Sequence, residues 1–91
     1  MNEKLLEKKL VKGIKERKGF CLKFIPTYAN GFPDRIIIMP GNRVYFVELK
    51  TTGKHLGPLQ VVWCERLLRM GCVWFLIDDE DKLKSFLNYV K

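Results

Sequence analysis

Two short apolar segments separated by a turn signal constrain the fold of this 91-residue chain more than any other feature. The first segment, 35–39, has a continuous apolar centre, which is typical of a strand buried on both faces. Pro40-Gly41-Asn42 follows as a turn signal, and the segment 44–50 returns as the partner strand. The pattern predicts an antiparallel β-hairpin in the middle of the chain.

Helical and strand patterns on either side of this hairpin complete one α/β domain, expected to span 1–91. In chain order they predict a helix over about 2–18, a strand over 20–25, a helix over about 59–70, a strand over 72–77 and a last helix after the acidic run 78–81. A strand–helix–strand unit over 44–77 should form a parallel crossover. The expected fold is therefore a small mixed sheet flanked by helices.

Each predicted helix has an apolar face for the core. The members are Leu6, Leu10, Val11 and Ile14 in the first helix, Leu59, Trp63, Leu67 and Met70 in the second, and Leu83, Phe86, Leu87 and Val90 in the last. Glu7 falls inside the first of these apolar arcs. Because burying a carboxylate without a partner is costly, an acid at this place requires a partner.

The net charge of +7 favours a polyanionic partner, either nucleic acid or an anionic membrane. No apolar run approaches the roughly 20 residues of a membrane helix, and the charged beginning of the chain is unlike a signal peptide. Cys21, Cys64 and Cys72 are odd in number and form no Cys-x-x-Cys pair. We therefore expect reduced cysteines in an intracellular protein, without a disulfide framework or a zinc finger.

Acidic and basic side chains gather at the open end of the hairpin. Asp34 stands at the start of one strand, and Glu48 and Lys50, two positions apart, point to the same side of the other. Antiparallel pairing brings Asp34 close to Glu48. Adjacent carboxylates suit a hard cation such as Mg²⁺ or Mn²⁺, and such a site can hydrolyse phosphodiesters. The plainer alternative is a turn aspartate beside an exposed Glu–Lys pair.

At this point the sequence resembles a known family. Pro33-Asp34 followed by Glu48-Leu49-Lys50 is similar to the signature of PD-(D/E)xK nucleases, and Gly31, Arg35 and the run Leu56-Gly57-Pro58-Leu59-Gln60 are similar to its VRR-NUC branch. The resemblance covers nearly the whole chain, and is greatest to the stand-alone members of phages and bacteria. It implies a restriction-endonuclease-like αβββαβ core with an extra C-terminal helix. Gly57 departs from the serine-like capping residue usual in the family.

The resemblance also implies a Mg²⁺- or Mn²⁺-dependent deoxyribonuclease and assigns roles to its residues. Asp34 and Glu48 would bind the metal, together with the backbone carbonyl of Leu49, and Lys50 would act on the water or the phosphate. Gln60 would support the site or touch the scissile strand. Glu7 matches an acidic position that approaches the metal through water, and the alternative is that it pairs with a nearby Lys or Arg.

DNA contacts are expected from Arg35, from Lys54 and His55 in the following loop, and from Lys8 and Lys12 on the basic first helix. The plainer alternatives are a solvent-exposed loop histidine for His55, a solvated face for the basic helix, and a contact that braces Glu48 for Arg35. The implied partner is duplex or branched DNA, such as a Holliday-like junction, bound by a homodimer in the cytoplasm of a bacterial or phage-infected cell. The alternatives are a non-catalytic DNA-binding module with the same fold, and an accessory subunit with a protein or RNA interface.

Overall fold

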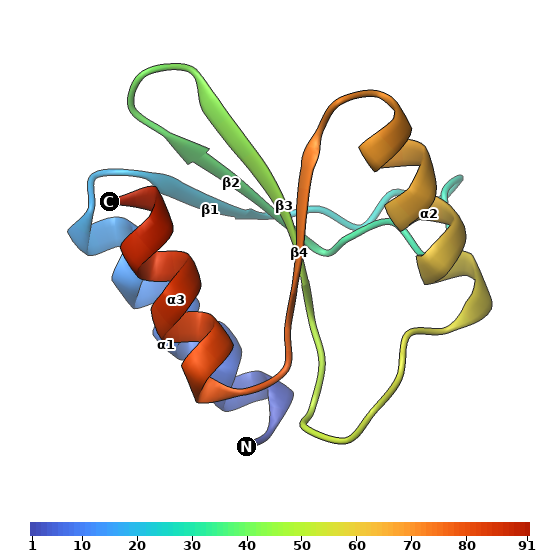
Figure 1. Ribbon diagram of the computed structural model, residues 1–91, viewed down its shortest axis with the longest axis horizontal. Coiled ribbons are helices and arrows are strands. Elements are labelled where there is room, and N and C mark those ends of the chain that lie inside the picture. Colours follow the sequence, from blue (N-terminus) through green and yellow to red (C-terminus); the bar gives the residue numbers. More distant parts are fainter.

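The computed structural model of the chain covers residues 1–91 (Figure 1). Its elements, in chain order, are α1 (Glu3–Glu16), β1 (Phe20–Lys23), β2 (Arg35–Met39), β3 (Arg43–Leu49), α2 (Pro58–Arg69), β4 (Val73–Ile77) and α3 (Glu80–Val90). This is the predicted restriction-endonuclease-like order with the extra C-terminal helix α3. None of the helices is long and apolar enough to span a membrane.

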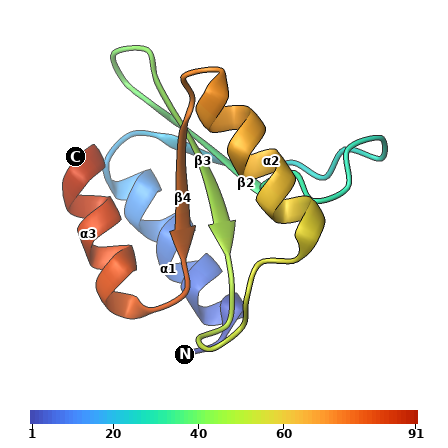
Figure 2. The same cartoon turned by 45° about the vertical axis from the view of Figure 1, so that its right-hand side comes forward.

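The four strands form one mixed sheet in the order β1-β2-β3-β4. β1, β2 and β3 pair antiparallel, and β3 and β4 pair parallel, so that their arrows point the same way in Figure 2. The predicted hairpin and parallel crossover are both confirmed. In the hairpin Arg35 lies opposite Val47, and this register aligns the start of β2 with the end of β3.

Helices cover both faces of the sheet (Figures 1 and 2). α1 and α3 lie together on one face, and α2 lies on the other. Alternate side chains of the central strands point under α1 and α3, and they form half of a core of twelve buried residues. These residues are Leu6, Leu10, Ile14, Ile37, Met39, Tyr45, Val47, Leu49, Ile77, Leu83, Phe86 and Val90.

The predicted core faces of α1 and α3 are largely correct, and that of α2 is not. Val11 is exposed at the edge of the α1 stripe, and Leu87 is only partly buried. In α2 only Trp63 and Leu67 turn inward, whereas Leu59 and Met70 are exposed. The apolar periodicity of α2 is helical, but the helix packs on a four-stranded sheet through its middle turns, so its two ends extend beyond the core.

The loop between β1 and β2 packs directly on the first turn of α2 at Gly31. This residue has a φ of +90°, and a Cβ added to it would lie 2.5 Å from the carbonyl carbon of Leu59 and 2.8 Å from the backbone nitrogen of Gln60. Any side chain here would push the loop away from the helix. Gly53 has a similar φ of +88° and has nothing within 4 Å of the same added atom.

These two glycines give a matched pair of substitutions. Gly53→Ala should lower the free energy of unfolding by about 1–2 kcal/mol, the cost of a left-handed backbone. Gly31→Ala should lower it by roughly 3 kcal/mol or more, because backbone crowding adds to the same strain. Denaturant unfolding followed by circular dichroism measures both values. Equal losses would show that the close approach at Gly31 has no energetic consequence.

Candidate active site

The hairpin register places Asp34 directly opposite Glu48, one step beyond the pair Arg35–Val47. Both carboxylates lie on the sheet face that α2 covers. Together with Lys50 and Gln60 they line a pocket of about 300 Å³. The structure thus brings together, in a single pocket, the four side chains for which the sequence suggests catalytic roles.

Two carboxylates in a partly buried pocket destabilise each other's charged form. Glu48 is only 6% exposed. Its burial, reinforced by the charge of Asp34, raises the pKa of its carboxyl from 4.5 to about 8, although Lys50 opposes the rise. Burial and the charge of Glu3 likewise raise the pKa of Asp34. The pocket therefore favours a positive charge between these groups.

The donor set fits a hard divalent cation. Oδ1 of Asp34 is buried and has no hydrogen-bond partner, and an unpartnered buried oxygen is costly unless a ligand satisfies it. Carboxylate oxygens are the ligands that Mg²⁺ and Mn²⁺ prefer, and Mg²⁺ usually keeps several waters. The chain has no tight cluster of three or more His, Cys, Asp and Glu side chains. Asp34 and Glu48 would thus share such a cation with water and other oxygens.

Gln60 connects the first turn of α2 to Glu48. Its Oε1 accepts a hydrogen bond from the backbone N–H of Gly57 at 2.8 Å, and its Nε2 donates to Oε2 of Glu48 at 3.1 Å. Gly57 has no side chain with which to complete a reciprocal capping box, so Gln60 alone caps this helix end. The bond to the helix start fixes the amide so that its donor faces the carboxylate.

A third acid in the pocket, Glu3, is one that the sequence analysis missed. It lies in the first turn of α1 and lines the pocket, whereas Glu7, one turn later, does not. Oε2 of Glu7 instead lies 2.9 Å from Nη2 of Arg35 and 3.8 Å from Nζ of Lys23. The spacing of four residues puts Glu3 and Glu7 on the same side of α1, and this was the available signal.

The residues with suggested DNA contacts lie outside this pocket. Arg35 points to the α1 face of the sheet, with its side chain 11% exposed, and it also donates to the carbonyl of Cys21 at 3.2 Å. Arg35 therefore braces α1 against the hairpin. Lys54 and His55 are exposed in the loop before α2, and Lys8 and Lys12 are exposed on α1.

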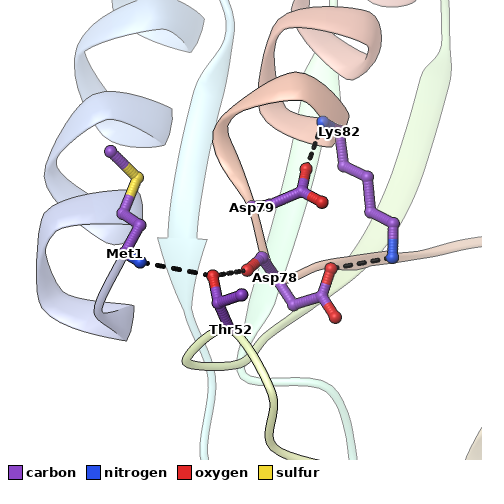
Figure 3. Close-up of polar contacts among 5 residues, drawn as sticks. All are labelled: Met1, Thr52, Asp78, Asp79 and Lys82. Carbon is purple, nitrogen blue, oxygen red and sulfur yellow. Dashed lines mark hydrogen bonds and ion pairs between the residues drawn. The ribbon is translucent and has the colours of Figure 1, made fainter.

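Two threonines hold the start of α1 against the loop that follows Lys50. The hydroxyl of Thr51 accepts from the backbone N–H of Glu3 at 3.1 Å, and the backbone N–H of Thr52 donates to the carbonyl of Met1 at 3.1 Å. The hydroxyl of Thr52 donates to the carbonyl of Asp78 (Figure 3). These bonds bring the first turn of α1 to the pocket, and the sequence gives no separate signal for them.

Comparisons with known proteins agree with the fold. A solved structure described as a VRR_NUC domain superposes with a TM-score of 0.89 over 98% of this chain and 97% of that chain, at 21% sequence identity. "Putative nuclease p44" of Acyrthosiphon pisum secondary endosymbiont phage 1 is 32% identical over 90 residues, which are 99% of this chain and 96% of the relative. No family model matches the sequence.

The fold and the comparisons together define a domain of the restriction-endonuclease-like class. Within that class the chain belongs to the VRR-NUC nuclease family.

Stability should depend on pH through Glu48. In the absence of divalent cations its carboxyl has a pKa of about 8 in the folded state and about 4.5 in the unfolded state. The folded protein then binds more protons between these values, so this group makes the free energy of unfolding fall as the pH rises from about 4.5 to 8. Glu48→Gln should flatten the dependence. Denaturant unfolding in EDTA between pH 5 and 8.5 measures it.

The exposed Glu65 supplies the matched control. Glu65→Gln should leave the pH dependence of wild type unchanged. A wild-type curve parallel to that of Glu48→Gln over the whole range would contradict the raised pKa.

Proposed function

We propose that this protein is a Mg²⁺- or Mn²⁺-dependent endonuclease that hydrolyses phosphodiester bonds in DNA. The observation that carries the proposal is the pair Asp34–Glu48, in which a buried carboxylate oxygen lacks any partner inside a pocket that also contains Lys50. The nuclease name of the phage relative and the net charge of +7 support the same substrate class.

The metal would be held by carboxylates from two strands and by a backbone oxygen. Asp34 and Glu48 supply the carboxylates, and the carbonyl of Leu49 is the backbone candidate between Glu48 and Lys50. Glu3 lies close enough to raise the pKa of both acids, and it would take the position suggested for Glu7. When bound, such a cation polarises a phosphoryl oxygen and makes water easier to deprotonate.

The other polar side chains of the pocket act on the phosphate and on the acids. Lys50 places a positive charge where negative charge develops on the pentacovalent phosphorus, and it can orient the attacking water. Gln60 holds the Glu48 carboxylate in one orientation through its bond to Oε2. Water oxygen bonds to phosphorus as the bond to the 3′-oxygen breaks, leaving a 5′-phosphate and a 3′-hydroxyl.

Cleavage should require Asp34 and Lys50. Asp34→Asn and Lys50→Ala should each lower the cleavage rate by roughly 10²-fold or more, because each removes charge at the reacting phosphate. The assay uses labelled duplex, single-stranded, flap and four-way-junction DNA with Mg²⁺, Mn²⁺ or EDTA. Asp81→Asn and Lys84→Ala, exposed on α3, are matched controls expected to cut normally.

Two results would overturn the assignment. If Asp34→Asn and Lys50→Ala cut at the wild-type rate, the pocket is not the active site. If folded wild-type protein binds DNA but cuts none of these substrates with either metal, the protein is a binding module that shares the nuclease fold.

A homodimer on duplex or branched DNA is part of this proposal. Four apolar side chains of the sheet, Phe20, Leu22, Ile38 and Val44, are exposed beyond the part that α2 covers. Phe20, Ile38 and Val44 lie in one row across three strands, on the same face as Asp34 and Glu48. Contiguous exposed apolar surface of this kind often marks an interface. A second copy on this face would give two active sites for two strands.

The oligomeric state tests this directly. Light scattering after size exclusion should give twice the chain mass for wild type and the chain mass for Phe20→Ser, since the substitution replaces the most exposed apolar side chain of the row with a hydroxyl. Met70→Ser, on the exposed end of α2, should remain dimeric. A monomeric wild type, alone and on DNA, would count against the dimer.

A further inference from the structure

The pocket that holds the carboxylates also has an apolar lining. Phe24, Ile25, Pro26 and Ala29 contribute to it, and all four come from the loop between β1 and β2. The charged side chains and Gln60, by contrast, come from α1, from α2 and from the hairpin end of the sheet. One pocket therefore offers charged groups suited to a phosphate and apolar groups suited to the flat face of a ring.

This loop is anchored at both sides of its tip. The ring of Phe32 packs edge-on against Phe24, Phe46 and Trp63, at centroid distances of 5.2–5.7 Å. Ala29 is buried, and Gly31 lies against the backbone of α2. The tip is therefore held in a fixed place beside the pocket.

Two large side chains of the same loop have no such packing. Ile25 is 71% exposed, and Tyr28 is 86% exposed. The ring of Tyr28 takes part in none of the ring–ring contacts of the molecule. Its neighbours Pro26 and Ala29 line the pocket, as does Ile25 itself. The side chain of Ile25 thus stands in water at the wall of the carboxylate pocket, and the ring of Tyr28 stands in water on the same loop, next in sequence to the pocket residue Ala29.

We propose that Ile25 and Tyr28 bind the base of an unstacked nucleotide next to the phosphate in the pocket. The inference rests on the proposed function, because it takes the phosphate of a DNA strand as the group that Asp34, Glu48 and Lys50 address. Bases stack on exposed aromatic rings with little regard to sequence, since every base has a π-face. The preferred substrate class is then DNA with an unpaired nucleotide at the cleavage point.

The pocket is small: at about 300 Å³ it is at the lower end of the range for ligand sites, a size that suits a single nucleotide unit. A base inside a duplex must leave its stack before it can reach Tyr28, and this step is least costly for unpaired nucleotides. Ile25 and Tyr28 thus provide selectivity for local strand structure that the carboxylates alone cannot provide.

Binding without metal tests the inference separately from catalysis. The probe is an oligonucleotide duplex with one unpaired 2-aminopurine, whose fluorescence changes as the base stacks or unstacks, titrated with wild-type protein in EDTA. Tyr28→Ala should weaken binding about fivefold or more and abolish the fluorescence change, whereas Tyr28→Phe should retain both. Met70→Ala, at a side chain 78% exposed on α2, should behave as wild type.

Cleavage supplies the second readout. For wild type with Mg²⁺ or Mn²⁺, kcat/KM should be higher on a duplex with one unpaired nucleotide than on the same duplex fully paired. Tyr28→Ala and Ile25→Ala should reduce this ratio towards one, chiefly through KM on the unpaired substrate. Met70→Ala, at an exposed side chain away from the pocket, should keep both the wild-type ratio and the wild-type activity on fully paired duplex.

The outcomes separate the two proposals. Tyr28-dependent binding of the probe by a wild type that cleaves nothing would refute the nuclease activity and retain the base contact. Metal-dependent cleavage with an unchanged substrate ratio in both variants would refute the base contact and retain the nuclease. If Tyr28→Ala instead converts a dimer to a monomer without altering the ratio, the two side chains form a subunit contact and the inference is wrong.

Discussion

The repulsion between two carboxylates forced together by strand pairing is the constraint on which the rest of this site depends. The register of β2 with β3 that buries Ile37 and Val47 on one face also places Asp34 against Glu48 on the other. A slip by one residue would separate the acids and turn the apolar side chains to the wrong face. Hydrophobic packing therefore holds the acids together and outweighs the electrostatic cost of their proximity.

The surrounding elements reduce that cost without removing it. Gln60 donates to Glu48, Lys50 lowers the pKa of the same carboxyl, and Oδ1 of Asp34 still lacks a partner. Carboxylates whose charged form is left partly destabilised in this way are common at sites that bind a ligand of opposite charge. On the opposite face of the sheet, Glu7 and Arg35 form a largely buried ion pair that holds α1 against the hairpin. The neighbouring residues Asp34 and Arg35 therefore lie on different faces, the first in the pocket and the second in a stabilising contact.

Much of the fold was predictable because apolar periodicity and Gly-Pro punctuation are local signals. The hairpin, the crossover and the places of Asp34, Glu48, Lys50 and Gln60 follow from strand alternation, from the turn at Pro40-Gly41-Asn42 and from the family resemblance. The position of Glu3 did not follow, since it depends on long-range contacts of α1, among them the hydrogen bond from the backbone N–H of Glu3 to the hydroxyl of Thr51. Leu59 and Met70 are exposed because α2 covers only part of the sheet. A helical wheel shows which residues share a face, but it does not show how much of that face meets the sheet.

The hydrogen bonds that join Thr51 and Thr52 to the start of α1 have a further consequence for assembly. Asp34, Glu48 and Lys50 are close in sequence and could come together in an isolated hairpin, but Glu3 reaches them only after α1 has docked and Thr51 has bound its backbone. The complete acidic set thus exists only in the finished tertiary structure. A partly folded chain would carry the hairpin carboxylates without the third acid, so the proposed chemistry would be coupled to completion of folding.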